Sequence, residues 1–341
     1  MEKIFAEHTP FFIAEVGQNH QGDLDLALEY IKVFSELGAN AIKFQTRNNK
    51  YLFSEDAYNA PYVSDNSFSD FYGEHREKLE LRPEWLKLLK KECIDRNVLF
   101  MSTPFDEPSL DLLISLDIDI LKVASFDLGN LPFLAKIART KKPIVLSIGG
   151  GNHHQIQDSI KLLKSFGSEL SVLHCVSEYP CPAEHLGFEN IPKLKKEYPD
   201  CVIGSSDHFN GILSGPIAWM MGARVFEKHV TLNRAWKGTD HGFALEREGF
   251  RKFVRDINRT QLMFKEKNQE LIGQEPVFKK LGKSLVASKD ISEGEVLSLE
   301  NLSGKIFKET YIPVRNSNEV LGRILKKDIQ AGNPIKLCDL V

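Results

Sequence analysis

The sequence predicts an α/β protein with a (β/α)8, or TIM, barrel followed by a small β-rich domain. Three observations lead to this fold: eight short apolar segments each precede a helical pattern in residues 1–265, the pattern breaks at 266–282, and an internal repeat fills much of 283–341. Eight βα units in roughly 250 residues is the usual size of such a barrel. A doubly wound sheet is the alternative, although no G-x-G-x-x-G turn follows the first apolar segment. We therefore expect a barrel at 1–265, a linker at 266–282 and a terminal domain at 283–341.

Composition narrows the class of protein. The chain has 341 residues, of which 42% are hydrophobic and 27% charged, as in ordinary soluble globular proteins. Its formal net charge of −3 argues against non-specific nucleic-acid binding. No apolar run is long enough to span a bilayer, and residues 1–4 begin no apolar signal core. The five cysteines are scattered without a Cys-x-x-Cys pair, so we expect reduced thiols in a cytoplasmic protein that binds neither nucleic acid nor membrane.

Each predicted strand is a short apolar run that a helical pattern follows. In the first of these helices, Leu24, Ala27 and Ile31 share one face, and Gly38 stops the pattern. The strands that the sequence predicts are, in order, 11–16, 41–45, 98–103, 120–125, 144–147, 171–175, 202–206 and 225–229.

The second βα connection, 46–81, is unusually long. A connection of this length in a compact barrel is usually a lid or a substrate wall. Its aromatic residues could equally form a local cap on the barrel; they are Tyr51, Phe53, Tyr58, Tyr62, Phe68, Phe71 and Tyr72.

A histidine ends each of the last two predicted strand segments. CVIGSSDH and ARVFEKH finish at His208 and His229, and the intervening HFNGILSGPIAWMMGA has an amphipathic helical pattern closed by Gly222. The strand ends of a parallel barrel meet at one face, where the chemistry of such proteins lies. The two imidazoles are therefore candidates for binding one divalent cation. The alternative is that each only hydrogen-bonds nearby backbone.

Two lysines and several hydroxyls are predicted to face the barrel mouth. Because side chains alternate along a strand, Lys43 and Gln45 share the inner face while Ile42 and Phe44 face the helices. Lys122 repeats this arrangement on the fourth strand. Ammonium groups and hydroxyls together suit a phosphate, or a ligand with both phosphate and carboxylate. Each strand-end hydroxyl taken alone is more simply a turn former; the four are Thr103, Ser125, Ser147 and Ser206.

Carboxylates are predicted at the same mouth. Glu15 ends the first strand, Asp127 follows the fourth, and Asp240 lies in WKGTDHG. Asp207 precedes His208, and Glu227 shares a strand face with His229. Such groups can orient an imidazole or carry a proton, although each could instead be an ordinary ion-pair partner.

The terminal region contains an internal repeat. KDISEGEVLSLENL at 289–302 aligns without gaps on KDIQAGNPIKLCDL at 327–340. Both copies place a glycine, Gly294 or Gly332, in a predicted turn followed by alternating apolar residues, which is typical of short β segments. A module of about 60 residues is marginal as an independent core, so we expect it to dock on another surface.

The order of these motifs resembles the sialic acid synthase family. The resemblance covers nearly the whole chain and rests on AEVGQNHQGD, IKFQT, STPF, LKVAS, VSEYP, GSSDH, EKH and WKGTDH, followed by KLGKSLVASKDISEGEVL. It implies an enzyme that condenses phosphoenolpyruvate with open-chain N-acetylmannosamine, or a related aldose, to give N-acetylneuraminate, or a related nonulosonic acid, and phosphate. It also implies a C-terminal antifreeze-like (SAF) domain of the β-clip type. In a domain-swapped homodimer, this domain would cover the partner's barrel mouth.

The resemblance assigns roles to the candidate residues. His208 and His229 become ligands of a divalent metal, Mn²⁺ or Mg²⁺. Glu15, Asp127 and Asp240 become catalytic carboxylates that lie near the metal, contact the sugar or transfer protons. The residues implied to bind substrate are Lys43, Gln45, Thr103, Lys122, Ser125, Ser147, Ser177, Tyr179 and Ser206.

Three stretches bear on the identity of the sugar. Asp127 stands where many relatives carry Glu, so this carboxylate is one methylene shorter. Bacterial relatives commonly offer the arginine of a Lys-Arg-Pro-Gly turn to the partner's sugar, but Ile306 stands here instead, which leaves Lys308, Arg315 and Arg323 as substitutes. WKGTDH and YGEH resemble animal-type members that accept a 6-phosphorylated sugar.

Other functions stay open at this point. Within the family, N-acetylneuraminate-9-phosphate, legionaminate and pseudaminate synthases are alternatives. Outside it, Lys122 or Lys43 inside a barrel would suit a Schiff-base aldolase. A carbohydrate-binding or ice-binding protein built around the terminal module is a third hypothesis.

Overall fold

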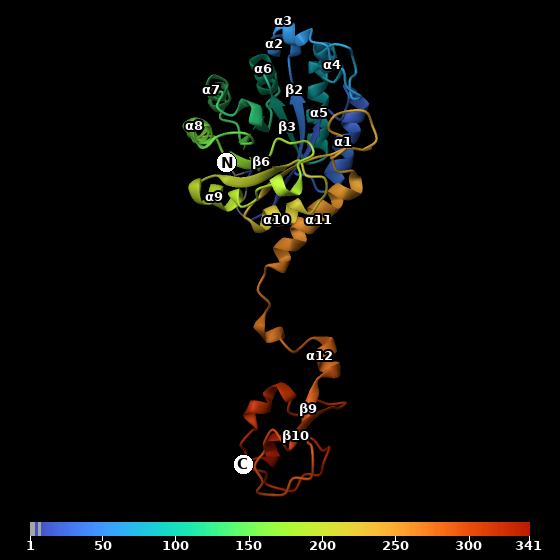
Figure 1. Cartoon of the computed structure of the whole chain (residues 1–341), viewed down its shortest axis with the longest axis vertical. Helices are drawn as coiled ribbons and strands as arrows, with labels where there is room; N and C mark the ends of the chain where they lie inside the picture. The colour runs from blue at the N-terminus through green and yellow to red at the C-terminus, as the bar shows by residue number, and fades with distance from the viewer. Residues whose placement is uncertain (1–3, 6–7) are drawn as a thin grey trace. The chain divides into compact units, whose positions relative to one another are not determined.

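The first part of the chain folds as a closed parallel barrel. The structure is a computed structural model that describes residues 4–5 and 8–341, and it divides into two compact units, Met1–Phe264 and Lys265–Val341. In the first unit, eight strands pair in sequence order and the eighth pairs with the first, which confirms the predicted barrel and excludes a doubly wound sheet (Figure 1). The strands are β1 (Phe11–Gly17), β2 (Ala41–Thr46), β3 (Leu99–Pro104), β4 (Ile120–Val123), β5 (Ile144–Ser147), β6 (Leu170–Cys175), β7 (Val202–Asp207) and β8 (Val225–His229).

Helices surround the barrel (Figure 1). In α1 the Asp23 side chain accepts a hydrogen bond from Leu26 N and caps the first turn, while Gly38, with φ of +97°, follows the last turn. The helix buries Tyr30 and Phe34 against the strands, as its apolar spacing predicts. The main helices are α1 (Leu24–Glu36), α5 (Pro83–Asp95), α6 (Glu107–Ser115), α7 (Leu131–Arg139), α8 (His153–Lys164), α9 (Asn190–Glu197), α10 (Ser214–Met220) and α11 (Arg247–Met263).

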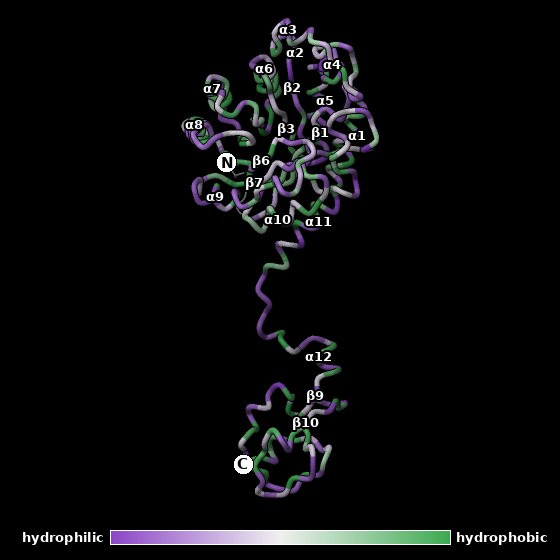
Figure 2. Tube along the Cα trace, viewed as in Figure 1, coloured by the Kyte–Doolittle hydropathy of each residue, from purple (hydrophilic) through white to green (hydrophobic). Residues whose placement is uncertain are grey.

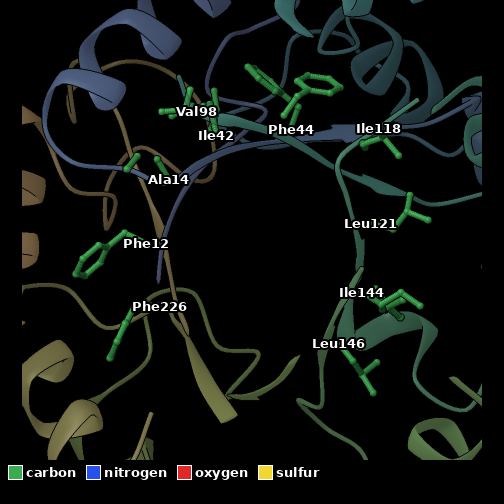
Figure 3. Packing of buried hydrophobic residues seen from close by; sticks show 14 of the residues in the cluster. Phe12, Ala14, Ile42, Phe44, Val98, Ile118, Leu121, Ile144, Leu146 and Phe226 are labelled. Carbon is green, nitrogen blue, oxygen red and sulfur yellow. The ribbon is translucent and has the colours of Figure 1, made fainter. Parts of the chain in front are cut away.

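Alternate residues of each strand face opposite sides of the barrel wall. Ile42 and Phe44 of β2 join the large core between strands and helices, and Figure 3 shows such side chains pointing away from the barrel centre. A second, smaller apolar cluster includes residues from between these positions, among them Ile13, Met101 and Leu173. This cluster fills the lower part of the barrel interior, because it comes from inward positions that precede the polar ones along each strand.

Two local differences from the predicted elements affect the mouth. β4 ends at Val123, so Ser125 lies in a 3-10 helix, Ser125–Asp127, rather than on the strand. The helix after β7 is α10, which is only seven residues long, because Phe209 forms a β-bridge with Cys181 and residues 210–213 form bends and a turn before it. Both differences lengthen the connections at the carboxyl ends of the strands.

The long connection after β2 is partly helical. It contains α2 (Asn49–Leu52), α3 (Glu55–Tyr58) and α4 (Tyr72–Lys78). Ring centroids of Tyr62 and Tyr72 lie 5.2 Å apart, and Tyr62 lies 4.6 Å from His75. Several of the aromatic residues of this connection thus pack on one another.

The second unit contains a two-stranded antiparallel sheet with a repeat around it. β9 (Lys283–Ala287) pairs with β10 (Leu302–Ile306). The two repeat copies bond to each other symmetrically: Ile291 bridges Ile329, Glu293 N donates to Asp328 Oδ1, and the equivalent Ala331 N donates to Asp290 Oδ1, both at 2.8 Å. Beyond the glycine turns the alternating apolar residues form single bridges rather than strands. The remaining short helices are η3 (Gln269–Leu271), α12 (Pro276–Leu281), η4 (Val314–Glu319) and η5 (Leu337–Asp339).

The chain between the barrel and this sheet is polar at its start. Figure 2 colours the stretch after α11 mostly purple, where the sequence runs Lys-Glu-Lys-Asn-Gln-Glu over 265–270. Across the described residues, no helix has the length and apolar character needed to cross a membrane.

Candidate active site

An ionised cluster lies inside the barrel, above the apolar layer. The Lys43 ammonium is 3.1 Å from Glu15 Oε2 and 3.2 Å from Glu227 Oε1, and all three side chains are at most 5% exposed. The register of β1 with β2 places Glu15 beside Lys43, and that of β7 with β8 places Ser206 beside Glu227. Because an unpaired buried charge is costly, one lysine shared by two carboxylates keeps the layer compatible with folding.

Burial and neighbouring charges set the ionisation of this cluster. Burial alone would lower the pKa of Lys43, but the two carboxylates raise it. Burial raises the pKa of Glu15, even though Lys43 opposes the shift. Burial also disfavours the Glu227 carboxylate, but Lys122 and Lys43 outweigh it and lower that pKa. Glu15 is thus the carboxyl group of the pair that exchanges a proton closer to neutral pH.

A second buried lysine, Lys122, lies on β4. Lys122 Nζ donates to Ser147 Oγ at 2.7 Å and to Val123 O at 2.9 Å. Burial lowers the pKa of Lys122 to about 8. Thr103 Oγ1 lies 3.4 Å from Lys43 Nζ, so hydroxyls accompany both ammonium groups as the sequence predicts.

Further hydroxyls gather around Gly149, after β5. Ser125 Oγ accepts a hydrogen bond from Gly149 N at 3.0 Å and lies 3.6 Å from Cys175 Sγ. A Cβ on Gly149 would meet Ser177 Oγ at 2.5 Å and Ser125 Oγ at 2.9 Å, so only glycine leaves room for these side chains. The Ser125 and Ser177 hydroxyls thus lie together beside Gly149, and hydroxyls can donate hydrogen bonds to an oxyanion.

The two histidines lie side by side at the ends of β7 and β8. Their ring centroids are 5.5 Å apart, and the Tyr179 ring lies 4.0 Å from that of His208. His208 Nδ1 is 2.7 Å from Val176 O, and since a carbonyl only accepts, Nδ1 carries the hydrogen. Burial, reinforced by the charges of His208 and Lys43, holds the pKa of His229 well below its usual value. His229 is therefore neutral, which is the form that binds metals.

A buried ion pair fixes the residues that precede the histidines. Lys228 Nζ lies 2.8 Å from Asp207 Oδ2 and also donates to Phe209 O, while Asp207 Oδ1 accepts from Phe209 N at 2.8 Å. Lys228 is fully buried on the helix side of the wall. Because Asp207 and Lys228 directly precede His208 and His229, this pair ties the two histidine-bearing backbones together.

The donor set fits a metal ion that keeps open coordination positions. His229 Nδ1 is buried without a hydrogen-bond partner, and Asp240 Oδ2 lies 3.8 Å from it. The hydrogen on His208 Nδ1 is bound to a carbonyl, which is how metal-binding imidazoles are commonly oriented. Among residues 4–5 and 8–341, no three His, Cys, Asp or Glu side chains are arranged to hold a metal by themselves. Two imidazoles and the more distant Asp240 carboxylate are therefore the donors that these residues offer to a divalent cation.

Gln45 and Asp240 lie on the β1 side of the mouth. Gln45 Nε2 donates to Glu15 Oε1 at 2.8 Å, and its carbonyl accepts from Arg47. A Cβ on Gly17 would meet Gln45 Nε2 and Glu15 Oε1 at 3.3 Å and Asp240 Oδ2 at 3.5 Å. These contacts place Asp240 beside Glu15 as well as beside His229.

Asp127 is not joined to this network. Its carboxylate accepts from Asn130 Nδ2 at 2.9 Å, and within the described residues no hydrogen bond or ion pair connects it to another candidate site residue. Burial raises its pKa. Its place in the 3-10 helix Ser125–Asp127 nevertheless puts it at the rim, two residues after Ser125.

Sequence reasoning missed parts of the site. Glu227 was noted only as a neighbour of His229, yet its Oε1 lies 3.2 Å from Lys43 Nζ and accepts a hydrogen bond from Ser206 at 3.1 Å. Strand alternation could have identified it, since it faces inward two positions before His229. Arg47, which pairs with Glu80 at 3.0 Å, and Cys175 carried no sequence signal beyond their residue type.

The fold and site define a (β/α)8 barrel with paired imidazoles, buried lysines and carboxylates at the carboxyl ends of its strands. The sequence model of the NeuB family matches residues 30–269, and that of the SAF domain matches residues 282–341. The chain belongs to the NeuB family and carries a C-terminal SAF domain.

Relatives in this family share most of the chain's length. N-acetylneuraminate-9-phosphate synthase of Homo sapiens is 33% identical over 318 residues, covering 93% of this chain and 89% of the relative. N,N'-diacetyllegionaminic acid synthase of Campylobacter jejuni is 35% identical over 332 residues, covering 95% of this chain and 98% of the relative. Among solved structures, the sialic acid synthetase of Leptospira borgpetersenii is 32% identical with a TM-score of 0.70, covering 79% of this chain and 91% of that one. These relatives are synthases of different nonulosonic acids.

Proposed function

We propose that this protein condenses phosphoenolpyruvate with an aldose to give a nonulosonic acid and phosphate. The observation that carries the proposal is the juxtaposition of two buried lysines and their hydroxyls with the paired histidines at one barrel mouth. N-acetylmannosamine giving N-acetylneuraminate is the reference reaction. Legionaminate, pseudaminate and N-acetylneuraminate-9-phosphate are the products of the alternative aldoses.

Phosphoenolpyruvate would lie inside the barrel mouth, against residues of β2 to β7 and the connections after them. Lys122 and Lys43 supply positive charge, while Ser125, Ser147, Ser177 and Thr103 donate hydrogen bonds to phosphate or carboxylate oxygens. Gln45, Ser206 and Tyr179 complete the walls of the same pocket. Lysine side chains held by burial and by Glu227 need little reorganisation when the charge of the departing phosphate develops.

The aldose would present its aldehyde between the histidines and the β1 side of the mouth. His208, His229 and, at longer range, Asp240 would hold the divalent ion, which supplies polarisation of the aldehyde as a Lewis acid. C3 of phosphoenolpyruvate attacks the aldehyde carbon, water adds at C2, and phosphate leaves with cleavage of its C–O bond. We assign Glu15, whose pKa is raised by burial, to proton movement beside Asp240. Asp127, at the rim, would contact the sugar.

Phosphate release measures this function directly. The chain is treated with a chelator and then assayed with phosphoenolpyruvate and each of N-acetylmannosamine, its 6-phosphate, mannose and a diacetamido-dideoxy aldose, with and without Mn²⁺ or Mg²⁺. We expect phosphate and a nine-carbon acid, detected by mass, only with metal and one class of aldose. Metal-independent release would refute the metal assignment, and no product from any aldose would refute the synthase.

A Schiff-base aldolase is the enzyme that competes with this proposal, since the pKa of Lys122 is lowered by burial to about 8. Borohydride treatment in the presence of pyruvate separates the two functions. The synthase gives no covalent adduct, whereas an aldolase gives a mass increase on a lysine.

We also propose a cytoplasmic homodimer in which the SAF domain covers the partner's barrel mouth. Five free cysteines support a reducing compartment. Exposed apolar side chains on the terminal unit, including Leu299, Val296 and Val341, support its docking. A monomeric mass in solution with full activity would contradict the dimer.

A further inference from the structure

A buried histidine follows Asp240 in the connection after β8. His241 is 1% exposed. Its Nδ1 lies 2.7 Å from Thr231 Oγ1, and its Nε2 lies 3.2 Å from Gln21 Nε2. Both ring nitrogens therefore have a partner in the protein, and the proposed reaction gives this imidazole no part.

The hydrogen-bond partners fix which nitrogen of His241 carries the hydrogen. Gln21 Nε2 also donates to Lys237 O at 2.7 Å, and because a carbonyl only accepts, this end of the Gln21 side chain is its NH2 group. An amide NH2 group only donates, so His241 Nε2 accepts from it and Nδ1 carries the hydrogen. His241 Nδ1 therefore donates to Thr231 Oγ1. The imidazole is thus a donor to one segment and an acceptor from another.

These two hydrogen bonds tie the residue after Asp240 to two neighbouring strand ends. Thr231 follows β8 and lies two residues after His229. Gln21 lies in the first βα connection, which follows β1, and β1 pairs with β8. The backbone of His241 is therefore held from the β1 side and from the β8 side of the mouth.

The Asp240 side chain has few partners of its own. Among residues 4–5 and 8–341, its carboxylate accepts one hydrogen bond, from the hydroxyl of the adjacent Thr239 at 2.9 Å. Its Oδ2 lies 3.8 Å from His229 Nδ1, which is too far for a hydrogen bond, and 3.5 Å from the place that a Cβ on Gly17 would take. The position of the Asp240 carboxylate therefore depends on the backbone that His241 holds.

The His241 ring is also closely packed by the rest of its connection. The Trp236 ring meets it edge to face, with the ring centroids 5.9 Å apart. Gly238 has φ of +146°, and a Cβ at this position would lie 2.7 Å from His241 Cδ2. Glycine therefore lets the backbone pass against the imidazole. Burial and packing leave a substrate no access to this ring, which excludes a direct role in binding.

We propose that His241 is a positioning residue, which uses Thr231 and Gln21 as anchors to keep the Asp240 carboxylate beside His229. The proposal rests on the proposed function, in which Asp240 helps to hold the divalent ion. Loss of a residue that orients a metal-binding group commonly lowers metal affinity roughly 10- to 100-fold. His241 acts on the ion only through Asp240, and Thr231 acts on it only through His241.

Affinity for Mn²⁺ in the absence of substrate tests the proposal. Electron paramagnetic resonance of free Mn²⁺ is measured with the full wild-type chain, D240N, H241F and D240N/H241F. H241F keeps a ring but loses both hydrogen bonds, so we expect it to weaken binding about as much as D240N, roughly 10-fold. The double variant should bind at most about threefold more weakly than D240N, because the two residues act as one unit. Losses that multiply in the double variant, unchanged affinity in H241F, or no binding by the wild type would overturn the proposal.

Thr231 provides matched variants that leave His241 in place. T231V removes the hydroxyl that accepts from His241 and should weaken Mn²⁺ binding as H241F does, whereas T231S keeps the hydroxyl and should bind like the wild type. Y30F is the control, since it removes another hydroxyl 3.4 Å from Thr231 Oγ1 without removing a partner of His241. Equal losses in Y30F and T231V would assign the effect to packing and overturn the proposal. H241F and T231V are independent variants, so a failure of one to fold leaves the other to decide.

Product formation separates this proposal from the proposed function. If the wild type makes no acid from any aldose, the proposed function fails, whereas the Mn²⁺ affinities still decide the role of His241. If the wild type makes product but the losses in D240N and H241F multiply, the function stands and the positioning role is rejected. With an aldose that reacts, H241F and T231V should lower kcat while the KM for phosphoenolpyruvate changes by less than about threefold.

Discussion

The lower and upper layers of the barrel interior come from the same strands and differ completely in chemistry. Ile13 and Glu15 are two residues apart on β1, and Leu173 and Cys175 are two apart on β6. The lower layer is apolar and close-packed, whereas the upper layer holds Lys43 and its two carboxylates. The lower layer can contribute to stability without any partner, but each charge above it depends on another charge. Stability and chemistry are thus separated along the barrel axis.

Replacing Lys43, the cation between the two carboxylates of the upper layer, should have the largest effect on stability. In K43M the carboxylates of Glu15 and Glu227 are left adjacent and unpaired, so we expect a loss of about 3–5 kcal/mol in the free energy of unfolding at pH 8. The remaining carboxylates then have raised pKa values in the folded state. Stability should therefore recover as pH falls, because one of them binds a proton more tightly when folded. Urea unfolding at pH 5 and 8 measures this.

The control for K43M is the double variant K43M/E227Q, which removes one of the two facing carboxylates. It should lose less stability at pH 8 than K43M and show a weaker pH dependence. Equal losses at both pH values in K43M would mean that the lysine matters for packing rather than for charge.

Truncating an apolar side chain of the lower layer should lower the free energy of unfolding by an amount that does not depend on pH. Leu173 Cδ2 fills the space that a Cβ on Gly204 would occupy, at 2.5 Å. L173A leaves a cavity, so we expect a loss of about 2–4 kcal/mol in unfolding free energy with no dependence on pH between 5 and 8. The residual activity per folded molecule should stay near the wild type. A large fall in kcat without a loss of stability would contradict the separation of layers.

The buried Lys228–Asp207 ion pair belongs to neither layer of the barrel interior, because it is ionic yet faces the helices. It therefore tests whether charges outside the interior also affect the site. In K228M the Asp207 carboxylate loses its partner and the two histidine-bearing backbones lose a tie, so we expect Mn²⁺ affinity to fall roughly 10- to 100-fold. Electron paramagnetic resonance of free Mn²⁺ reports this without an activity assay. K228R should restore affinity, and K252M, at an exposed lysine, should have no effect. Unchanged Mn²⁺ affinity in K228M would leave the pair a purely structural role.

The pH dependence of substrate affinity is the smallest expected effect. Since burial lowers the pKa of Lys122 to about 8, the ammonium loses its proton as pH rises through that value. We expect kcat/KM for phosphoenolpyruvate to fall above pH 8, by up to tenfold per pH unit, while binding persists below it. K122R, whose guanidinium does not titrate in this range, should remove the inflection. The same inflection in K122R would assign it to another group.

The strands of the barrel could be predicted because each has its own local signal. The apolar run at 225–229 coincides with β8, and alternation along β2 correctly separates Lys43 from Ile42 and Phe44. The repeat at 289–302 and 327–340 also predicted the turns at Gly294 and Gly332, which have φ near +83° and +84°. These features depend on residues within a few positions of one another.

Side chains from distant segments were less predictable. Arg76 and Gln18 are 58 residues apart, and nothing in YGEHREK indicates that this arginine reaches the first βα connection. Ser125 was predicted at a strand end but lies in a 3-10 helix, because β4 stops at Val123. Asp127 was grouped with Glu15 and Asp240, yet its hydrogen bond is to Asn130.

The sequence by itself determined the barrel, the order of its strands, the inward lysines and the position of both histidines at strand ends, because period and spacing are local properties. Only the tertiary structure decided which charges meet. It gave Lys43 two carboxylates, tied Asp207 to Lys228, and brought Arg76 to Gln18. The physical reason is that the ionisation and pairing of a buried side chain depend on neighbours brought together by closure of the barrel, not on neighbours in the chain.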